Sequence, residues 1–316
     1  MLALMRWVGG AAVLCAIPFL LQPYELDLYR KLLFWVALAI SYNFLFGISG
    51  QMALSHFAFA GIGAYAVVIL MTQAGLPLGL AVVVALALAA ALALIVALAA
   101  TRLEGFYLAL ATLAFAQLLI VVLNEGGSLT GATGGLTNYR LPPIFGFVIG
   151  GPGTAIIMIA VLLGTLAILL RIDRSWFGRA CRAIRDNSEA AAAMGIDVAR
   201  TKTIAFTTTS VMAAAAGMVY AFFDNTEYPP VFRIDNAILL LFMVIVGGSG
   251  SHLGAIVGAV LLKLSQDFLE PIVGHYHALG FGVIVVVAIL IQPKGLIGMW
   301  DQIRARRTTA RKRAGS

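Results

Sequence analysis

The sequence predicts an all-α polytopic membrane protein with about ten transmembrane helices and with both termini in the cytoplasm. Of its 316 residues, 61% are hydrophobic and only 11% are charged, whereas an average soluble domain has about 25% charged residues. Leu, Ala, Val and Ile form long unbroken runs. The sequence also contains 33 glycines, which membrane helices tolerate because small residues let helix backbones pack closely. So few ionisable side chains exclude a water-soluble fold, and we expect residues 1–316 to form a single transmembrane domain.

Ten apolar runs are candidates to span the roughly 30 Å hydrocarbon core, which takes about 20 helical residues. Their expected ranges are 2–21, 32–48, 52–71, 76–100, 103–123, 153–170, 203–223, 235–246, 253–270 and 279–292. Every span must be helical, because an open sheet edge would leave backbone groups unpaired in lipid. No small-residue cleavage site follows the first run, so we expect a retained helix there rather than a signal peptide. The run at 235–246 is short, so it either extends past Gly247 or forms a broken helix of the sort that lines transport sites.

Lys and Arg residues predict the orientation, because cytoplasmic loops carry an excess of them. The cytoplasmic loop (171–202) and the basic tail (293–316) hold seven each. Four expected spans separate these two regions and six precede the first, so both regions and the N terminus fall on the cytoplasmic side. With Arg6 and Arg102, 16 of the 21 basic residues lie inside. The formal net charge of +7 therefore indicates topology rather than nucleic-acid binding.

A stretch of glycine and polar residues interrupts the apolar pattern near residue 50. It contains Gly50, Gln51, Ser55 and His56 and leads into the next span. Free N–H groups and polar side chains at such a break are how transporters present a polar path at membrane depth. These residues are candidates for a translocation path or gate. The alternative is a tight turn followed by small-residue helix packing.

A similar break follows the eighth apolar run. Ser249, Ser251 and His252 lie among glycines there, and Gly254 and Gly258 then form a GxxxG pattern. Interrupted segments in two halves of a chain indicate a binding region in transporters, so these three polar residues are further candidates for a path or gate. The alternative is a cytoplasmic turn followed by a packing motif. The chain has no G-x-x-x-x-G-K-[ST] sequence, so we expect no ATPase activity of its own.

Other chemistry finds little support in the sequence. Lys263 and Asp267 are four residues apart within a span, so they can pair on one helix face. The alternative to this pair is that the Lys263 side chain extends toward the outer surface of the membrane, with its amine in water. The four histidines are dispersed, and His275 and His277 lack the further ligands that a zinc site needs. We expect no metal site, no cofactor bound by this chain and no enzyme activity.

The cytoplasmic loop contains a short helix with clear start and stop signals. Asn187 or Ser188 can cap its N terminus, and Glu189 lies favourably in its first turn. Gly195 ends it where a left-handed residue is needed, and Ile196 is placed for the accompanying apolar contact. Such a helix at the membrane surface is typical of a docking element. The alternative is a rigid turn without a partner.

The same loop resembles a known family. The sequence from Gly178 to Asn187, continued by 189–196, is similar to the cytoplasmic loop of bacterial ABC-importer permeases for branched-chain amino acids, the LivM type. Further similar segments occur in the same order at residues 50–55, 61–65, 107–115, 130–137 and 246–251. Together the resemblance covers residues 30 to 295, and the joint occurrence is more specific than any single segment.

The resemblance implies an ABC-importer permease fold in the bacterial inner membrane, with alternating access driven by separate ATPase subunits. The implied partners are a second, LivH-like permease chain, two ATP-binding subunits that use ATP, and an extracytoplasmic substrate-binding protein. The substrate would be a branched-chain amino acid, although related permeases serve urea and short amides. The residues implied to dock into an ATP-binding subunit are Asp186, Asn187, Ser188, Glu189, Ala190, Met194, Gly195 and Ile196.

An ion-coupled secondary transporter is the rival from another class of protein. It would need a buried carboxylate on the transport path, and Asp267 is the candidate for that role. Uptake by vesicles that carry an ion gradient but lack any ATPase would favour this alternative.

Overall fold

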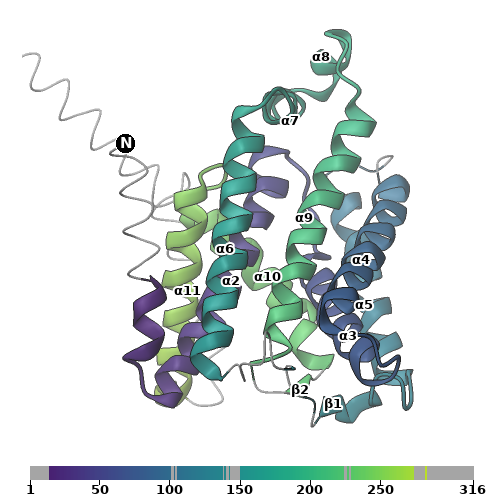
Figure 1. Ribbon diagram of the computed structural model, residues 1–316. Coiled ribbons are helices and arrows are strands. Elements are labelled where there is room, and N and C mark those ends of the chain that lie inside the picture. Colours follow the sequence, from purple (N-terminus) through teal and green to yellow (C-terminus); the bar gives the residue numbers. More distant parts are fainter. Residues whose placement is uncertain are drawn as a thin grey trace, which may run out of the picture.

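The protein is a bundle of helices in the computed structural model, which describes residues 14–100, 103, 105–137, 139, 142, 150–223, 226–227, 229–273 and 282 (Figure 1). The helices are η1 (Ile17–Phe19), α2 (Pro23–Asn43), η2 (Phe44–Ile48), α3 (His56–Thr72), α4 (Leu78–Ala100), α5 (Phe106–Glu125), η3 (Ala132–Gly134), α6 (Gly151–Arg174), α7 (Trp176–Asp186), α8 (Ser188–Ala193), α9 (Val198–Tyr220), η4 (Pro229–Phe232), α10 (Ile234–Gly247) and α11 (His252–Val273). Two short strands, β1 (Leu136–Thr137) and β2 (Thr226–Glu227), pair antiparallel, with Leu136 opposite Glu227.

The expected all-α membrane architecture is confirmed. Within the described residues, five helical segments are long and apolar enough to cross a membrane: Pro23–Ile48, Leu78–Ala99, Phe106–Glu125, Gly151–Arg174 and Val198–Tyr220. The helices α3 and α10 are shorter and also apolar. The first 13 residues, nearly all of the expected span at 279–292, and the basic tail lie outside the described residues.

The start of the second span was predicted too late. The helix α2 begins at Pro23 rather than at residue 32, with Pro at its first position and a capping box between Gln22 and Glu25. Asp27, Arg30 and Lys31 lie within the helix because they neutralise one another: Asp27 Oδ1 is 3.0 Å from Arg30 Nη2, and Asp27 Oδ2 is 2.6 Å from Lys31 Nζ. A prediction of spans from hydropathy leaves such charged residues out of the helix. Paired charges can nevertheless lie at the end of a span.

The eighth span does not extend past Gly247. The helix α10 ends at that residue, and Gly248 adopts φ +114°, which an L side chain rarely adopts. The chain then turns and enters α11 at His252. This half of the bundle therefore contains a short helix, a glycine turn and a second helix.

Small residues permit the closest helix contacts in the core. A Cβ atom on Gly63 of α3 would lie 2.1 Å from the Ala214 carbonyl oxygen of α9, and one on Gly217 of α9 would lie 1.9 Å from that of Ala60. On α4, alanines every fourth residue are buried against this pair (Ala81, Ala85, Ala89, Ala93 and Ala97). Membrane helices commonly pack in this way, because small residues let backbones approach.

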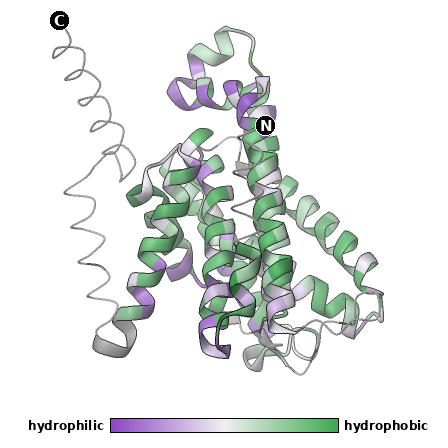
Figure 2. Cartoon of the chain, turned by 60° about the vertical axis from the view of Figure 1, so that its left-hand side comes forward, coloured by the Kyte–Doolittle hydropathy of each residue, from purple (hydrophilic) through white to green (hydrophobic). Residues whose placement is uncertain are grey.

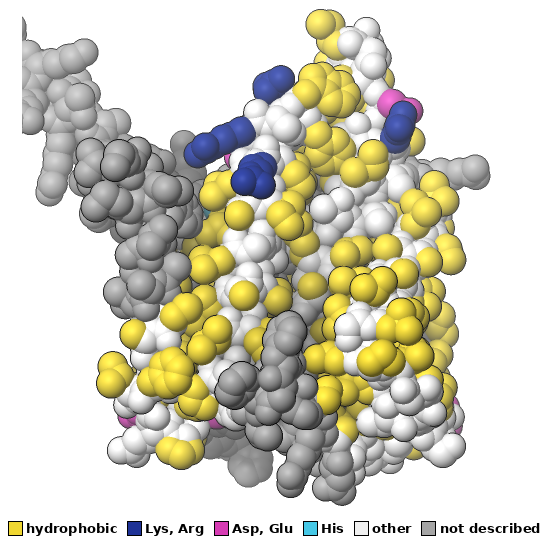
Figure 3. Space-filling model, viewed as in Figure 1, with side chains coloured by type: hydrophobic (Ala, Val, Ile, Leu, Met, Phe, Trp, Pro, Cys, Tyr) yellow, Lys and Arg dark blue, Asp and Glu magenta, His cyan; other side chains and the backbone are white. Residues whose placement is uncertain are grey.

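The loops separate into two groups at opposite ends of the bundle. At one end, Gln73 Nε2 bonds the carbonyls of Ser128 and Leu129, and β1 pairs with β2. At the other end lie α7 and α8, and Figure 2 shows hydrophilic residues at this end below the tip. Hydrophobic side chains cover the surface between the two ends, and the Lys and Arg side chains visible in Figure 3 lie at the end that carries α7 and α8. This distribution is typical of a polytopic membrane protein with one basic face.

Candidate functional site

The helix α8 is capped at its start as the sequence predicts. Asn187 is the N-cap, and its Oδ1 accepts a hydrogen bond from the Ala190 backbone N–H at 2.9 Å. Glu189 lies in the first turn, where a carboxylate stabilises the positive end of the helix dipole. Of the two candidates for the cap, Asn187 performs this role, and Ser188 is the first helical residue.

The end of α8 also follows the prediction. Gly195 has φ +84°, its N–H bonds the Ala192 carbonyl at 2.9 Å, and the Ile196 N–H bonds the Ala191 carbonyl at 3.1 Å. These two bonds form the Schellman arrangement, in which a left-handed residue satisfies the last carbonyls of a helix. Asp197 then caps α9 through its Oδ1 and the Arg200 N–H. The loop between α7 and α9 is thus rigidly specified by local hydrogen bonds.

One face of α8 is presented to the outside. Ala191 is buried, whereas Glu189, Ala190 and Gly195 are exposed and Met194 is 84% exposed. In Figure 1 this helix lies at the tip of the molecule, beyond the ends of α6 and α9. An exposed methionine on a short, well-capped helix suits docking into a pocket of another protein, because its flexible thioether adapts to irregular surfaces.

The first break (residues 47–55) follows a π-helical end of α2. The segment η2 runs from Phe44 to Ile48, and Gly50 has φ +73°. Gln51 is buried, and its Nε2 donates to Ser49 Oγ at 2.6 Å and to the Lys202 carbonyl at 3.1 Å. The break is therefore attached to the first turns of α9, the helix that follows α8.

Ser55 and His56 lie deeper in the bundle. Both are almost fully buried, and His56 Nε2 is 2.9 Å from Ser41 Oγ of α2. The ring of Tyr42 contacts the His56 ring edge to face, with centroids 5.4 Å apart. A polar pair enclosed by α2 and α3 links these helices. A role in the transport path stays a prediction.

The second break (residues 247–252) lies directly against the first. The Gly250 N–H donates to Asn43 Oδ1 at 2.8 Å, and a Cβ atom on Gly47 would lie 2.3 Å from the Gly250 nitrogen. Ser249 is exposed, and neither ring nitrogen of His252 has a hydrogen-bond partner among the described residues. The two breaks, which the sequence only suggests to be similar, thus meet in space.

The GxxxG pattern serves helix packing. A Cβ atom on Gly258 would lie 2.0 Å from the Met243 carbonyl oxygen, and one on Gly247 would lie 2.0 Å from that of Gly254. These contacts hold α10 and α11 together at their shared turn. For Gly254 and Gly258 the packing alternative is therefore confirmed.

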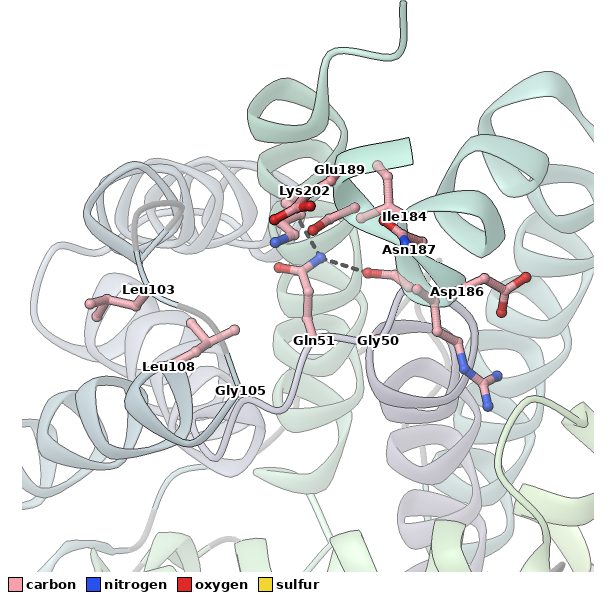
Figure 4. Close-up of a pocket in the computed structure, with 13 residues that line it drawn as sticks. Gly50, Gln51, Leu103, Gly105, Leu108, Ile184, Asp186, Asn187, Glu189 and Lys202 are labelled. Atoms are coloured by element: carbon pink, nitrogen blue, oxygen red, sulfur yellow. Dashed lines mark hydrogen bonds between the residues drawn. The ribbon is translucent and has the colours of Figure 1, made fainter. Parts of the chain in front are cut away.

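A polar cavity of about 380 Å³ joins the first break to some of the residues predicted to couple transport to ATP hydrolysis (Figure 4). In Figure 4, Gln51 lies between Leu103 and Leu108 on one side and Asp186 and Asn187 on the other. The cavity is lined by Ser49, Gly50, Gln51, Leu103, Gly105, Leu108, Ile184, Arg185, Asp186, Asn187, Ser188, Glu189 and Lys202. Two groups of residues predicted separately, for the path and for coupling, therefore share one cavity.

Several predicted residues lie outside this cavity. They are Ser55, His56, Ala190, Ser249, Ser251, His252, Met194, Gly195 and Ile196. Conversely, Arg185 and Lys202 line it, although the sequence marks them only as basic residues of a cytoplasmic loop. The Arg182 side chain, by contrast, pairs with Asp173 of α6. Arg179, Arg182 and Arg185 recur every third residue in α7 but make different contacts.

The one charged pair predicted within a span is formed. Lys263 Nζ is 2.6 Å from Asp267 Oδ1, and the amine lies 5.9 Å from the centre of the Trp35 ring. Both side chains are mostly buried, so the lysine does not extend to the surface. Asp267 is neutralised by this contact, which weakens its case as the free carboxylate of an ion-coupled transporter. The described residues contain no group of three or more His, Cys, Asp or Glu that could hold a metal ion.

Comparison with known proteins gives a consistent set of relatives. Residues 26–291 match the family model described as branched-chain amino acid transport system / permease component. The chain is 28% identical over 306 residues to the high-affinity branched-chain amino acid transport system permease protein LivM of Escherichia coli K12, covering 89% of this chain and 72% of the relative. The LivM protein of Salmonella typhimurium is 27% identical over the same shares of the two chains.

A second type of relative is more distant. The permease protein LivH of Escherichia coli K12 is 25% identical over 283 residues, which cover 84% of this chain and 91% of the relative. No solved structure matches the chain significantly.

Proposed function

This chain belongs to the family of branched-chain amino acid transport system permease components, and from that premise we propose that it is the membrane-spanning permease subunit of an ABC importer for branched-chain amino acids. Its relatives LivM and LivH are both named as permease proteins of such a system. The permease itself performs no chemistry. Its task is a pathway polar enough to admit a zwitterion and weakly binding enough to release it.

The proposed topology has ten spans with both termini in the cytoplasm of a bacterium, in its inner membrane. It is supported by the two groups of loops, because the first break, α7, α8 and the second break share one end of the bundle. The cytoplasmic loop carries basic residues at that end, as the positive-inside rule requires. Arg30, which bonds the Phe223 carbonyl three residues before β2, then falls at the outer end.

The proposed mechanism is alternating access. The observation that carries it is the exposed, doubly capped α8 beside a polar cavity that reaches Gln51. One of the two ATP-binding subunits would dock on α8, and the ATP-driven closure of the two subunits would move the loop and open the path to one side at a time. A LivH-like chain would complete the permease pair, and an extracytoplasmic binding protein would deliver substrate. Gly50, Gln51, Ser55, His56, Ser249, Ser251 and His252 remain the proposed path or gate residues.

A double variant, Glu189→Ala with Gly195→Val, tests docking. Valine at φ +84° is strained, and removal of the carboxylate weakens the first turn, so α8 should lose its docking geometry. We expect normal amounts of protein in the membrane, loss of co-purification with the ATP-binding subunit, and loss of uptake. The matched control is Glu125→Ala with Gly127→Val at the opposite end, where Glu125 is exposed and Gly127 has φ +57° with open space around it. Normal uptake by the first double variant would refute docking through α8.

Substrate class is tested separately with the purified complex and labelled leucine, urea and short amides. We expect leucine to be transported and urea and short amides to be poor competitors. Preferential transport of urea or amides would retain the permease class and overturn the proposed substrate.

A further inference from the structure

Arg185, the penultimate residue of α7, lies where the two breaks meet. Its Nη1 donates a hydrogen bond to the Gly47 carbonyl oxygen in η2. The same nitrogen would lie 3.0 Å from a Cβ atom on Gly250 of the second break. A Cβ atom on Gly50 would lie 3.1 Å from Cβ and Cγ of Arg185. Three glycines from two breaks thus lie close to one arginine side chain of the cytoplasmic loop.

The Gly47 carbonyl is a suitable partner for a cation. The last carbonyls of a helix have no intrahelical donor and carry the negative end of the helix dipole. Gly47 lies in the last turn of the continuous helical segment Pro23–Ile48, and Arg185 supplies both a donor and a positive charge at that end. A charge-assisted bond of this kind is stronger than one between neutral groups.

The two breaks are also joined to each other close to the contact between Arg185 and Gly47. The Gly250 N–H bonds Asn43 Oδ1, one turn before Gly47 on the same helical segment. Only Asp186 separates Arg185 from Asn187, the N-cap of α8. A displacement of α8 would therefore reach the end of α2, and the turn between α10 and α11, through the contacts of Arg185.

We propose that Arg185 is a positioning residue that transmits movement of the docking helix α8 to both breaks at once. This inference rests on the proposed function, in which α8 docks on the ATP-binding subunit. The other α7 arginines make different contacts: Arg182 Nη2 bonds the Asp173 carbonyl at 2.8 Å, and Arg179 Nη1 bonds the Arg174 carbonyl at 3.2 Å. These two hold α7 to α6, whereas Arg185 holds it to the breaks.

The test compares Arg185→Ala with the matched control Arg182→Ala in the complete complex, in proteoliposomes. Both variants remove one arginine from the same helix, and thermal unfolding and co-purification report folding and assembly. For Arg185→Ala we expect at least tenfold slower uptake with ATP hydrolysis within about twofold of the wild type. We expect Arg185→Lys, which keeps the cation, to recover at least a third of the wild-type uptake rate. Arg182→Ala should retain coupled uptake.

A second measurement follows the geometry without using transport. Hydrogen exchange of the amides in residues 47–51 and 248–252 should accelerate together in Arg185→Ala and stay unchanged in Arg182→Ala. Equal uptake losses in the two alanine variants, or uptake by Arg185→Ala within twofold of the wild type, would overturn this inference and leave the proposed function intact. Absence of ATP-driven uptake in the wild-type complex would instead overturn the proposed function, and the coupling role with it.

Discussion

Gln51 and Lys202, which are 151 positions apart, are joined by a hydrogen bond of 3.1 Å from the Gln51 side-chain Nε2 to the Lys202 carbonyl oxygen. The same amide bonds Ser49 Oγ at 2.6 Å. This buried side chain connects the break after α2 to α9, the helix that follows α8. The contact forms one wall of the polar cavity in Figure 4.

Replacing Gln51 with leucine should loosen this connection while keeping a side chain of similar size. Both hydrogen bonds are lost, at a net cost of about 1 kcal/mol each, and we expect uptake to fall about threefold to tenfold while ATP hydrolysis continues. The ratio of transported substrate to hydrolysed ATP is the measurement. Gln73→Leu is the matched control, because Gln73 Nε2 also bonds two oxygens but at the opposite end of the bundle. Equal ratios in the two variants would contradict a role of Gln51 in coupling.

Gly63→Ala should destabilise the protein strongly. The added methyl group would lie 2.1 Å from the Ala214 carbonyl oxygen, so α3 and α9 must separate. Overpacking of this kind costs about 1–3 kcal/mol, and the thermal midpoint in detergent should drop. Gly164→Ala on α6 serves as control, because no atom of the described residues lies within 4 Å of a Cβ added there and alanine is the better helix former. Similar midpoints for the two variants would disprove the close crossing of α3 and α9.

Arg30→Leu should also destabilise the fold, at the end of the bundle opposite α7 and α8. Arg30 is buried, its Nη1 bonds the Phe223 carbonyl at 2.8 Å, and its guanidinium lies over the Phe223 ring. Loss of a hydrogen bond from a charged group costs about 1.5–3 kcal/mol. Lys31→Met, which removes a more exposed partner of the same Asp27, should cost about 1 kcal/mol or less. The free energies of unfolding of the two variants give the comparison, and a larger loss for Lys31→Met would count against the buried role of Arg30.

Cys181 should resist thiol reagents in the folded protein. Burial raises the pKa of this α7 thiol to about 12, and the side chain is almost fully covered. A raised pKa keeps the thiol protonated as the pH rises from 7 to 9, whereas an ordinary exposed cysteine becomes largely ionised over that range. Maleimide labelling of a Cys15→Ser protein should therefore stay slow across these pH values and become fast in denaturant. Rapid labelling of the native protein at pH 7 would show that α7 does not pack as described.

The local features of the site are those that the sequence predicts best. Asn187, Gly195 and Asp197 have the side chains or backbone freedom that a cap or a helix stop requires, so their roles follow from neighbours a few residues away. Hydropathy likewise identifies the apolar helices. It misplaces the start of α2 at residue 32, because Asp27 and Arg30 count as polar although they neutralise each other.

Contacts between distant segments could not be predicted from the sequence. Asn43 and Gly250 are 207 positions apart, and their hydrogen bond depends on how α2, α10 and α11 pack. Arg185 looks like one of several equivalent basic residues in the loop, and only the packing of α7 distinguishes its contact with Gly47 from the contact of Arg182 with Asp173. No local pattern could have separated the two.

Uptake of labelled leucine by sealed proteoliposomes containing the complete complex is the measurement that tests the central claim most directly. ATP is supplied on the side that exposes α8, with the binding protein on the other side, and ion gradients are abolished by ionophores. We expect uptake that requires ATP, persists without any ion gradient and is lost with the Glu189→Ala and Gly195→Val double variant. Uptake by this chain that proceeds without ATP and follows an imposed ion gradient would contradict the assignment as an ABC-importer permease.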